Sequence, residues 1–249
     1  MMTGSQDKSQ LNTAKNVAIV LAAGQGRRMH SDVPKQFLDL CGRPVAAWSL
    51  QAFQDFPGVD AVILVTSEED IEYCQSELID KYRFDKVKRI VSGGAERYLS
   101  VWKGLQAAKD YLQEMNSAES IVFIHDGARP VIDSALLDRA LACAKENRAC
   151  VVGMPVKDTI KIADEDGFAQ QTPDRRLVWQ VQTPQVFSFS LVYGAYQKLI
   201  ADGITNVTDD AMVVELESST KVKLVEGSYR NLKITTPEDL LTAEQFLQK

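Results

Sequence analysis

The sequence is poor in the residues that build metal sites and disulfide frameworks. Its 249 residues include only four cysteines and two histidines, and no two cysteines form a C-x-x-C pair. A structural zinc site or a dithiol redox motif is therefore not expected. We expect buried, reduced thiols in a cytoplasmic protein. The four cysteines are Cys41, Cys74, Cys143 and Cys150.

Long apolar runs and an excess of positive charge are also missing. No stretch approaches the roughly eighteen consecutive apolar residues that a membrane-spanning helix needs. The polar beginning of the chain, MMTGSQDKSQLNTAKN, does not resemble a secretory signal. With 28 basic and 34 acidic residues, the net charge of −6 argues against a nucleic-acid-binding surface. We expect neither a membrane nor a nucleic acid as partner.

The composition that is present is that of an ordinary globular protein, with 45% apolar and 25% charged residues. A chain of this length buries roughly 70–75% of the surface that it exposes when unfolded, so it can form a substantial core without cross-links. We expect a single domain over residues 16–249, preceded by a disordered extension over residues 1–15.

Short runs rich in β-branched residues alternate with longer amphipathic segments. The runs predict buried strands at Val17–Leu21, Ala61–Val65, Val87–Val91, Ile121–Ile124 and Cys150–Val152. The segments between them have helical periodicity, at Val45–Phe56, Glu69–Tyr82, Glu96–Glu114 and Asp133–Asn147. This alternation predicts an α/β fold with a Rossmann-like, doubly wound and mostly parallel sheet. Such sheets bind ligands beyond the carboxyl ends of their strands.

A polar segment after Met154 interrupts the alternation. Residues 156–163 alternate in polarity, Asp164–Gly167 predicts a hairpin turn, and the chain then returns as far as Gln182. This segment, at about 156–181, is too polar for the inside of the sheet, so we expect a protruding β-arm. The rest of the chain predicts helices at Ser188–Ala201 and Asp209–Leu216, a strand pair at Val222–Glu226 and Leu232–Thr235, and a last helix with Thr236 as cap and Pro237 in its first turn.

The strongest chemical signal is the glycine-rich loop that follows the first predicted strand. Its sequence, AAGQGRRM, begins at Ala22 and is followed by Pro34-Lys35-Gln36. The backbone N–H groups of such a loop can surround phosphate oxygens, and the nearby cations suit a triphosphate. The loop lacks the third glycine of a dinucleotide fingerprint, which disfavours an NAD-dependent oxidoreductase, and it lacks the Gly-Lys-Ser/Thr of a P-loop. A plain glycine turn with solvated arginines is the alternative.

Together with further motifs, this loop resembles the signature of nucleotidyltransferases that activate sugar or polyol phosphates. Within that group the chain resembles the cytidylyltransferase family that makes 4-diphosphocytidyl-2-C-methyl-D-erythritol in isoprenoid synthesis, from about Val17 to Phe246. The further motifs are Ser92-Gly93-Gly94-Ala95-Glu96-Arg97 with Ser100, His125-Asp126-Gly127-Ala128-Arg129-Pro130, Lys157-Asp158-Thr159, Trp179 with Gln182-Thr183-Pro184-Gln185, Thr208-Asp209-Asp210, and Asn231 with Lys233.

The resemblance implies an activity and residues that perform it. The implied reaction joins CTP and 2-C-methyl-D-erythritol 4-phosphate to give 4-diphosphocytidyl-2-C-methyl-D-erythritol and pyrophosphate. Arg28 and Lys35 are the implied catalytic residues, in keeping with the use of fixed cations to stabilise charge that develops at the α-phosphate. The implied CTP-binding residues are Ala22, Ala23, Gly24, Gly26, Arg28, Lys35, Gly94, Ser100, Asp126 and Gly127.

The resemblance also implies an acceptor site and a metal ion. Basic and hydroxyl side chains suit a phosphate monoester that carries several hydroxyl groups. Mg²⁺ is the implied cofactor, held mainly by the CTP phosphates and contacted by Asp126. The implied acceptor-binding residues are Asp126, Arg129, Thr159, Arg175, Thr183, Thr208 and Lys233.

The implied assembly is a homodimer whose arms cross, so that Thr159 and Arg175 complete the acceptor site of the other chain; closed two-fold pairs are common among soluble proteins. An arm that folds over its own site is the alternative. A ribitol-5-phosphate cytidylyltransferase would share the motifs, and a catalytically silent protein could share the fold. Taken one by one, Gly93-Gly94 could be a simple turn, the threonines could be strand-surface residues, and His125 could be structural.

Overall fold

The computed structural model describes residues 14–24, 33–117 and 119–248, and seven strands form its central sheet. Their order is β11-β7-β10-β6-β1-β4-β5. Neighbouring strands are parallel, except that β10 runs antiparallel to β6 and to β7. The predicted α/β fold with a mostly parallel sheet is therefore confirmed. The strands are β1 (Val17–Leu21), β4 (Ala61–Thr66), β5 (Val87–Ser92), β6 (Ile121–Asp126), β7 (Ala149–Pro155), β10 (Trp179–Ser188) and β11 (Lys223–Glu226).

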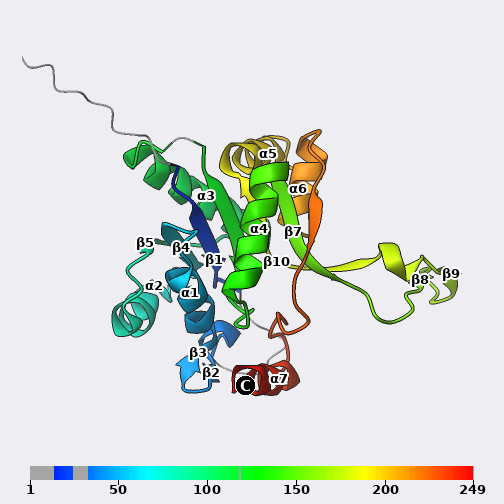
Figure 1. Cartoon of the computed structure of the whole chain (residues 1–249), viewed down its shortest axis with the longest axis horizontal. Helices are drawn as coiled ribbons and strands as arrows, with labels where there is room; N and C mark the ends of the chain where they lie inside the picture. Colours follow the sequence, from blue (N-terminus) through cyan, green and yellow to red (C-terminus); the bar gives the residue numbers. More distant parts are fainter. Residues whose placement is uncertain (1–13, 25–32, 118, 249) are drawn as a thin grey trace, which may run out of the picture.

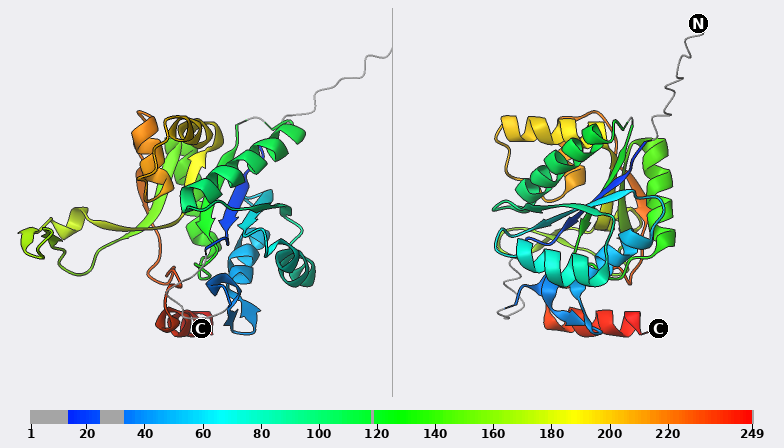
Figure 2. Two further views of the ribbon diagram at one scale, coloured as in Figure 1. Left: turned by 180° about the vertical axis from the view of Figure 1, so that it is seen from behind. Right: turned by 90° about the vertical axis from the view of Figure 1, so that its left-hand side faces the viewer.

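Helices cover both faces of the sheet, as Figures 1 and 2 show. One core lies under α1 (Val45–Asp55), under α2 (Ile71–Tyr73) with the π-helix η3 (Cys74–Asp80), and under α4 (Ser134–Asn147). The other lies under α3 (Arg97–Glu114), α5 (Phe189–Ala201) and α6 (Asp210–Glu217). Strand β1 is apolar throughout because successive side chains enter opposite cores.

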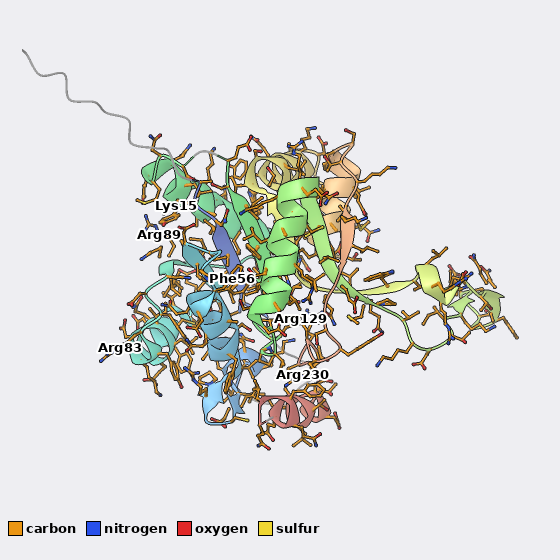
Figure 3. The ribbon with its side chains drawn as sticks, viewed as in Figure 1. Lys15, Phe56, Arg83, Arg89, Arg129 and Arg230 are labelled. Carbon is orange, nitrogen blue, oxygen red and sulfur yellow. The ribbon has the colours of Figure 1, made fainter. Side chains whose placement is uncertain are left out.

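Side chains fill the space between these layers. Phe56, which directly follows α1, is buried and packs its ring against Phe123 of β6. Charged side chains such as those of Arg83 and Arg89 are exposed at the outside of the molecule (Figure 3). No helix in the described part of the chain is long and apolar enough to cross a membrane.

Strand β10 is the element that the sequence pattern misses. It lies inside the sheet between β6 and β7, although residues 182–185 are polar and include a proline. A proline normally argues against a central strand. It is tolerated here because the pairing with β7 shifts between Val181 and Gln185. The side chain of Gln185 also has partners, since it donates to Asp209 and accepts from the N–H of Ala211.

The predicted strand at Leu232–Thr235 is wrong, because these residues follow an irregular path. Their backbone groups bond elsewhere: the Ile234 N–H donates to the Ala128 carbonyl, and the Ile234 carbonyl accepts from Lys35. Strand β11 pairs with β7 instead. The irregular segment lies beside the carboxyl ends of the strands and leads into α7 (Pro237–Leu247). Helix α7 begins with a capping box of Thr236 and Asp239, so the predicted helix start is confirmed.

The segment between β7 and β10 extends away from the rest of the molecule (Figure 1). It contains the antiparallel pair of β8 (Ile162–Ala163) and β9 (Ala169–Gln171), as the hairpin signal predicts, followed by the 3-10 helix η4 (Arg175–Leu177). Gly167 in the turn has a φ of +88°, which glycine adopts without strain. Phe168 and Leu177 are 73% and 81% exposed, so the arm presents apolar side chains that the described part of the chain does not cover.

Candidate active site

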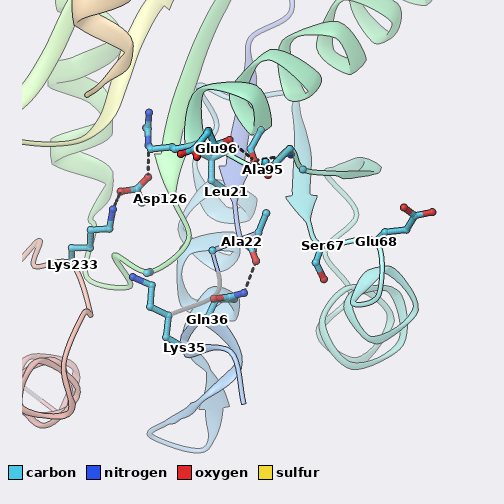
Figure 4. Close-up of a pocket in the computed structure, with 17 residues that line it drawn as sticks. Leu21, Ala22, Lys35, Gln36, Ser67, Glu68, Ala95, Glu96, Asp126 and Lys233 are labelled. Carbon is cyan, nitrogen blue, oxygen red and sulfur yellow. Dashed lines mark hydrogen bonds and ion pairs between the residues drawn. The ribbon is translucent and has the colours of Figure 1, made fainter. Parts of the chain in front are cut away.

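A cavity of about 850 Å³ lies at the carboxyl ends of the central strands (Figure 4). This is the edge at which a doubly wound sheet is expected to bind its ligand. Eight residues that the sequence assigns to a substrate site line this cavity together: Ala22, Ala23, Gly24, Lys35, Gly94, Ser100, Asp126 and Lys233. Gly26 and Arg28, which the sequence also assigns to it, lie outside the described residues.

The beginning of the glycine-rich loop is fixed by two hydrogen bonds that the backbone groups of Ala22 make, one with backbone and one with a side chain. Its N–H donates to the Val65 carbonyl at 2.6 Å, and its carbonyl accepts from the side chain of Gln36 at 2.6 Å. Gln36 is buried and lines the cavity, although the sequence analysis gives it no role. Its bond joins the loop after β1 to the short helix η2 (Lys35–Phe37), and Figure 4 shows both segments side by side.

Lys35 is the first residue of this same short helix. Its Nζ donates to the carbonyl of Ile234 at 3.0 Å, a residue almost two hundred positions further along the chain. Phe37 anchors the helix against Tyr73, with ring centroids 4.8 Å apart. The ammonium group is therefore held at the cavity wall by packing and by a hydrogen bond.

The opposite wall is the loop that joins β5 to α3. The Gly93 N–H donates to the Thr66 carbonyl at 2.7 Å, and the Gly94 N–H donates to Ser100 Oγ at 3.0 Å. A Cβ atom on Gly93 would stand 2.7 Å from the Cβ of Ala23 and 2.8 Å from Ser100 Oγ. Glycine is therefore required at position 93, because this loop approaches the loop after β1 so closely.

Asp126 lies at the end of β6, between the two walls. Its side chain is the meeting point of two cations: Arg97 Nε is 3.3 Å from Oδ1, and Lys233 Nζ is 2.7 Å from Oδ2 (Figure 4). Asp126 is only 8% exposed. Burial alone raises the pKa of this carboxyl, but the charges of Arg97 and Lys233 outweigh burial and hold the pKa well below its usual range. Asp126 is therefore ionised at neutral pH.

A second group of polar side chains lies behind Asp126. Thr183 Oγ1 accepts from the Asp126 N–H at 3.0 Å and is 3.0 Å from His125 Nδ1. Burial lowers the pKa of His125 to about 4, so its imidazole is neutral near pH 7. Arg129 (Figure 3) donates to the Asn231 carbonyl at 2.8 Å, while its buried Nε has no hydrogen-bond partner among the described residues. Such an arrangement can take an anionic group, because a buried guanidinium gains most from a charged acceptor.

Comparisons with known proteins identify the family. The sequence model of IspD, 2-C-methyl-D-erythritol 4-phosphate cytidylyltransferase, matches residues 16–249. The protein of that name from Lachnospira eligens is 48% identical over 234 residues, which are 94% of this chain and 99% of the relative. This chain belongs to that family. The resemblance inferred from the motifs is thereby confirmed, and the chain is a CTP-dependent nucleotidyltransferase.

Solved structures of IspD proteins have the same fold. The 4-diphosphocytidyl-2C-methyl-D-erythritol synthase from Anaerococcus prevotii matches with a TM-score of 0.80 at 34% identity, over 95% of this chain and 99% of that one. The 2-C-methyl-D-erythritol 4-phosphate cytidylyltransferase from Thermus thermophilus matches with a TM-score of 0.73 at 29% identity, over 94% of this chain and 100% of that one.

The remaining residues that the family resemblance implies do not line the cavity in this IspD chain. Gly127 bonds the end of β6 to β1, since its N–H donates to the Leu21 carbonyl at 2.8 Å. Thr159 and Arg175 lie on the extended arm, and Thr208 is exposed just before α6. The arm as a whole, the segment between β7 and β10, protrudes from the rest of the molecule (Figure 1).

Sequence reasoning gives no role to three residues that organise the site. Arg97 lines the cavity and contacts Asp126. Asp210 accepts two hydrogen bonds from Arg97, and Asn231 bonds Arg129 through its carbonyl and Thr183 through its side chain. All three stand inside motifs quoted above, so membership of a motif was the available signal. Their partners are set by the fold and cannot be read from neighbouring positions.

Proposed function

We propose that this IspD chain binds CTP and 2-C-methyl-D-erythritol 4-phosphate in the cavity at the ends of β1, β5 and β6, and joins them with release of pyrophosphate. The observation that carries the proposal is the placement of Asp126 between Arg97 and Lys233, with Lys35 lining the same cavity. Two anionic substrates can meet only where cations offset their charge, and this cavity supplies those cations.

The transfer is an in-line displacement at phosphorus. An oxygen of the acceptor phosphate attacks the α-phosphorus of CTP, a new P–O bond forms, and the bond to the β-phosphate oxygen breaks to release pyrophosphate. The attacking oxygen is already ionised, so no general base is required. Lys35 and Arg28 stabilise the charge that spreads over the oxygens of the α-phosphate in the transition state.

The nucleotide is proposed to lie between the two glycine-containing loops. Gly94 and Ser100 contact the cytosine ring, and the narrow approach of the loops rejects purines by size. The triphosphate lies along the loop after β1, and the ribose lies near Asp126. The residues proposed for the loop and the strand end are Ala22, Ala23, Gly24, Gly26 and Gly127.

The acceptor is proposed to lie on the other side of Asp126. Lys233, Arg129, Thr183 and Thr208 bind it from the same chain, and Thr183 also accepts a hydrogen bond from the backbone N–H of Asp126. Thr159 and Arg175 reach it from the arm of a second copy in a crossed homodimer. The exposed apolar side chains of the arm support this proposal, because a partner chain would cover them. The cytoplasm is the proposed compartment, because the reaction needs a supply of CTP.

Mg²⁺ is the proposed cofactor, and the donor groups present fit an ion that arrives with the nucleotide. Among the described residues, no three His, Cys, Asp or Glu side chains cluster as a metal site would require. One carboxylate, Asp126, is enough for an ion that takes most of its oxygen ligands from phosphates. When bound, the ion supplies positive charge to the triphosphate.

The test measures pyrophosphate release with CTP and each of two acceptors, 2-C-methyl-D-erythritol 4-phosphate and ribitol 5-phosphate. We expect kcat/KM to be higher with the erythritol phosphate by about 10²-fold or more, because an acceptor that leaves hydrogen-bonding groups of the site unpaired is rejected strongly. UTP and ATP in place of CTP should be poor donors. A higher kcat/KM with ribitol 5-phosphate would assign the chain to the alternative reaction.

A further inference from the structure

The first residue of α3, Arg97, connects two carboxylates from distant parts of the chain. Its Nη1 and Nη2 donate to the two oxygens of Asp210 at 2.9 and 2.8 Å, and its Nε is 3.3 Å from Asp126 Oδ1. Asp210 is the first residue of α6. It also accepts from the hydroxyl of Tyr196 in α5, at 2.6 Å. One guanidinium thus joins the end of β6 to three helices on one face of the sheet.

The far end of this network is fully buried. Asp210 and Tyr196 have no exposed surface, whereas the side chain of Arg97 is 30% exposed and lines the cavity. A buried carboxylate is costly unless it is paired and hydrogen-bonded, so Asp210 requires Arg97. Burial alone lowers the pKa of Arg97, but Asp210 and Asp126 raise it well above its usual value. The cation is permanent.

The geometry separates two tasks within one side chain. The bidentate contact with Asp210 fixes the plane of the guanidinium, because both of its terminal nitrogens donate to that carboxylate. That leaves Nε directed at Oδ1 of Asp126, while Oδ2 remains with Lys233. Figure 4 shows the carboxylate held from both sides. Lys233 alone would hold Asp126 through one flexible side chain.

We propose that Arg97 is a positioning residue for the transfer reaction: anchored by Asp210 and Tyr196, it fixes the orientation of the Asp126 carboxylate against which both substrates are placed. The inference rests on the role of Asp126 in the proposed function. A lysine cannot replace Arg97 here. Its single ammonium group cannot donate to both oxygens of Asp210 and also to Asp126.

The test is a double-mutant cycle on kcat with Arg97→Lys and Asp126→Asn. Arg97→Lys should lower kcat by about 10–100-fold and change KM for CTP by less than about 3-fold, because misplacement of a positioned group costs mainly transition-state stabilisation. Asp126→Asn should lower kcat at least as much. If Arg97 acts through Asp126, the double variant should be within about 3-fold of Asp126→Asn alone. A merely structural role would make the two losses multiply.

Tyr196→Phe and Arg89→Lys complete the design. Tyr196→Phe removes one bond to Asp210 and keeps the buried ring, so it should lower kcat by a smaller factor, about 3–10-fold, and this loss should also vanish in the Asp126→Asn background. Arg89 donates from Nη2 to both carboxylate oxygens of Glu114 on the exposed edge of the sheet. Arg89→Lys should therefore leave kcat and KM unchanged.

The outcomes separate this inference from the proposed function. Wild-type turnover with an unchanged kcat in Arg97→Lys would overturn the inference alone, and so would multiplicative losses in the double variant. If Arg97→Lys does not fold, the same cycle with Tyr196→Phe and Asp126→Asn decides in the same way. Absence of wild-type turnover with the erythritol phosphate would overturn the proposed function and, with it, this inference.

Discussion

Lys35 illustrates how this fold prepares a cation for an anionic substrate. Its ammonium donates to the carbonyl of Ile234, and its short helix is held by the Phe37–Tyr73 contact and by Gln36. A carbonyl oxygen that accepts from an ammonium group helps to fix the position of that group. The substrate therefore meets a cation whose position requires little further ordering.

Lys35→Ala should lower kcat by about 10²–10⁴-fold, because the α-phosphate loses a charged contact that strengthens in the transition state. The free energy of unfolding should change by less than about 1 kcal/mol, since the side chain is only partly buried. The measurement is steady-state pyrophosphate release together with urea unfolding. Lys81→Ala is the matched control, because Lys81 is exposed and its contacts, an ion pair with Glu77 and a position over the ring of Tyr82, lie outside the cavity. A folded Lys35→Ala variant with most of its kcat would contradict the assignment.

The cysteines differ sharply in their surroundings, and this predicts one reactive thiol. Cys41 is exposed in the turn between β2 (Asp39–Leu40) and β3 (Arg43–Pro44). Burial raises the pKa of Cys74 to about 11 and raises the pKa of Cys150 as well. At pH 8 the native protein should show a single fast phase with a thiol reagent, because only a thiolate that solvent reaches can react. Cys41→Ser should abolish that phase; its persistence would show that the half-buried Cys143 also reacts, and would contradict the prediction of one reactive thiol.

At the scale of elements, two glycines within helices are expected to have opposite effects on the free energy of unfolding when they are replaced by alanine. A Cβ on Gly104 in α3 would stand 2.6 Å from Ile19 Cγ2 and 3.1 Å from Val65 Cγ2, whereas a Cβ on Gly194 in α5 would meet nothing within 4 Å. Gly194→Ala should raise the free energy of unfolding by about 0.5–1 kcal/mol, through helix propensity and a less flexible unfolded chain. Gly104→Ala should lower it by about 1–3 kcal/mol, because β-branched core side chains cannot move away. Urea unfolding of both variants checks this, and a change of the same sign in both would refute it.

The elements that could be predicted from sequence are those whose own residues carry the signal. Strand β1 has the predicted bounds because it is apolar on both faces, and α7 begins where its cap and proline indicate. Strand β10 could not be predicted, because the groups that satisfy Gln182 and Gln185 belong to Ser228, Asp209 and Ala211. These hydrogen bonds form only when the chain has folded.

The same limit applies to the active site. The cavity wall after β1 was predictable because its glycines and cations are neighbours in sequence. The contact between Arg97 and Asp210 joins residues 113 positions apart, so no local sequence pattern predicts it. The Asn231 contacts with Arg129 and Thr183 are hidden for the same reason. Local motifs therefore locate residues that are proposed to meet the substrates, whereas the contacts that hold these residues in place form only when the chain folds.

At the scale of the whole molecule, the arm is the segment that the described chain leaves unpacked. Its exposed Phe168 and Leu177 lie on a segment that extends away from the rest of the molecule (Figure 1). Arg175, on the same arm, donates only to the Lys157 carbonyl among its described hydrogen bonds. The proposed crossed homodimer gives these side chains a partner and brings Arg175 to the acceptor site of the other copy.

Mixing two inactive variants tests this assembly. Lys35→Ala damages the cavity and Arg175→Ala damages the arm, so each homodimer should be nearly inactive. In a mixed dimer with shared sites, one site combines both lesions and the other has neither. Random pairing makes about half of the dimers mixed, and half of their sites are intact, so about a quarter of wild-type activity should return. If each chain supplied its own arm, every site would keep one lesion. Activity that stays at the level of the single variants, after chain exchange is verified by mass labelling, would therefore exclude the shared site.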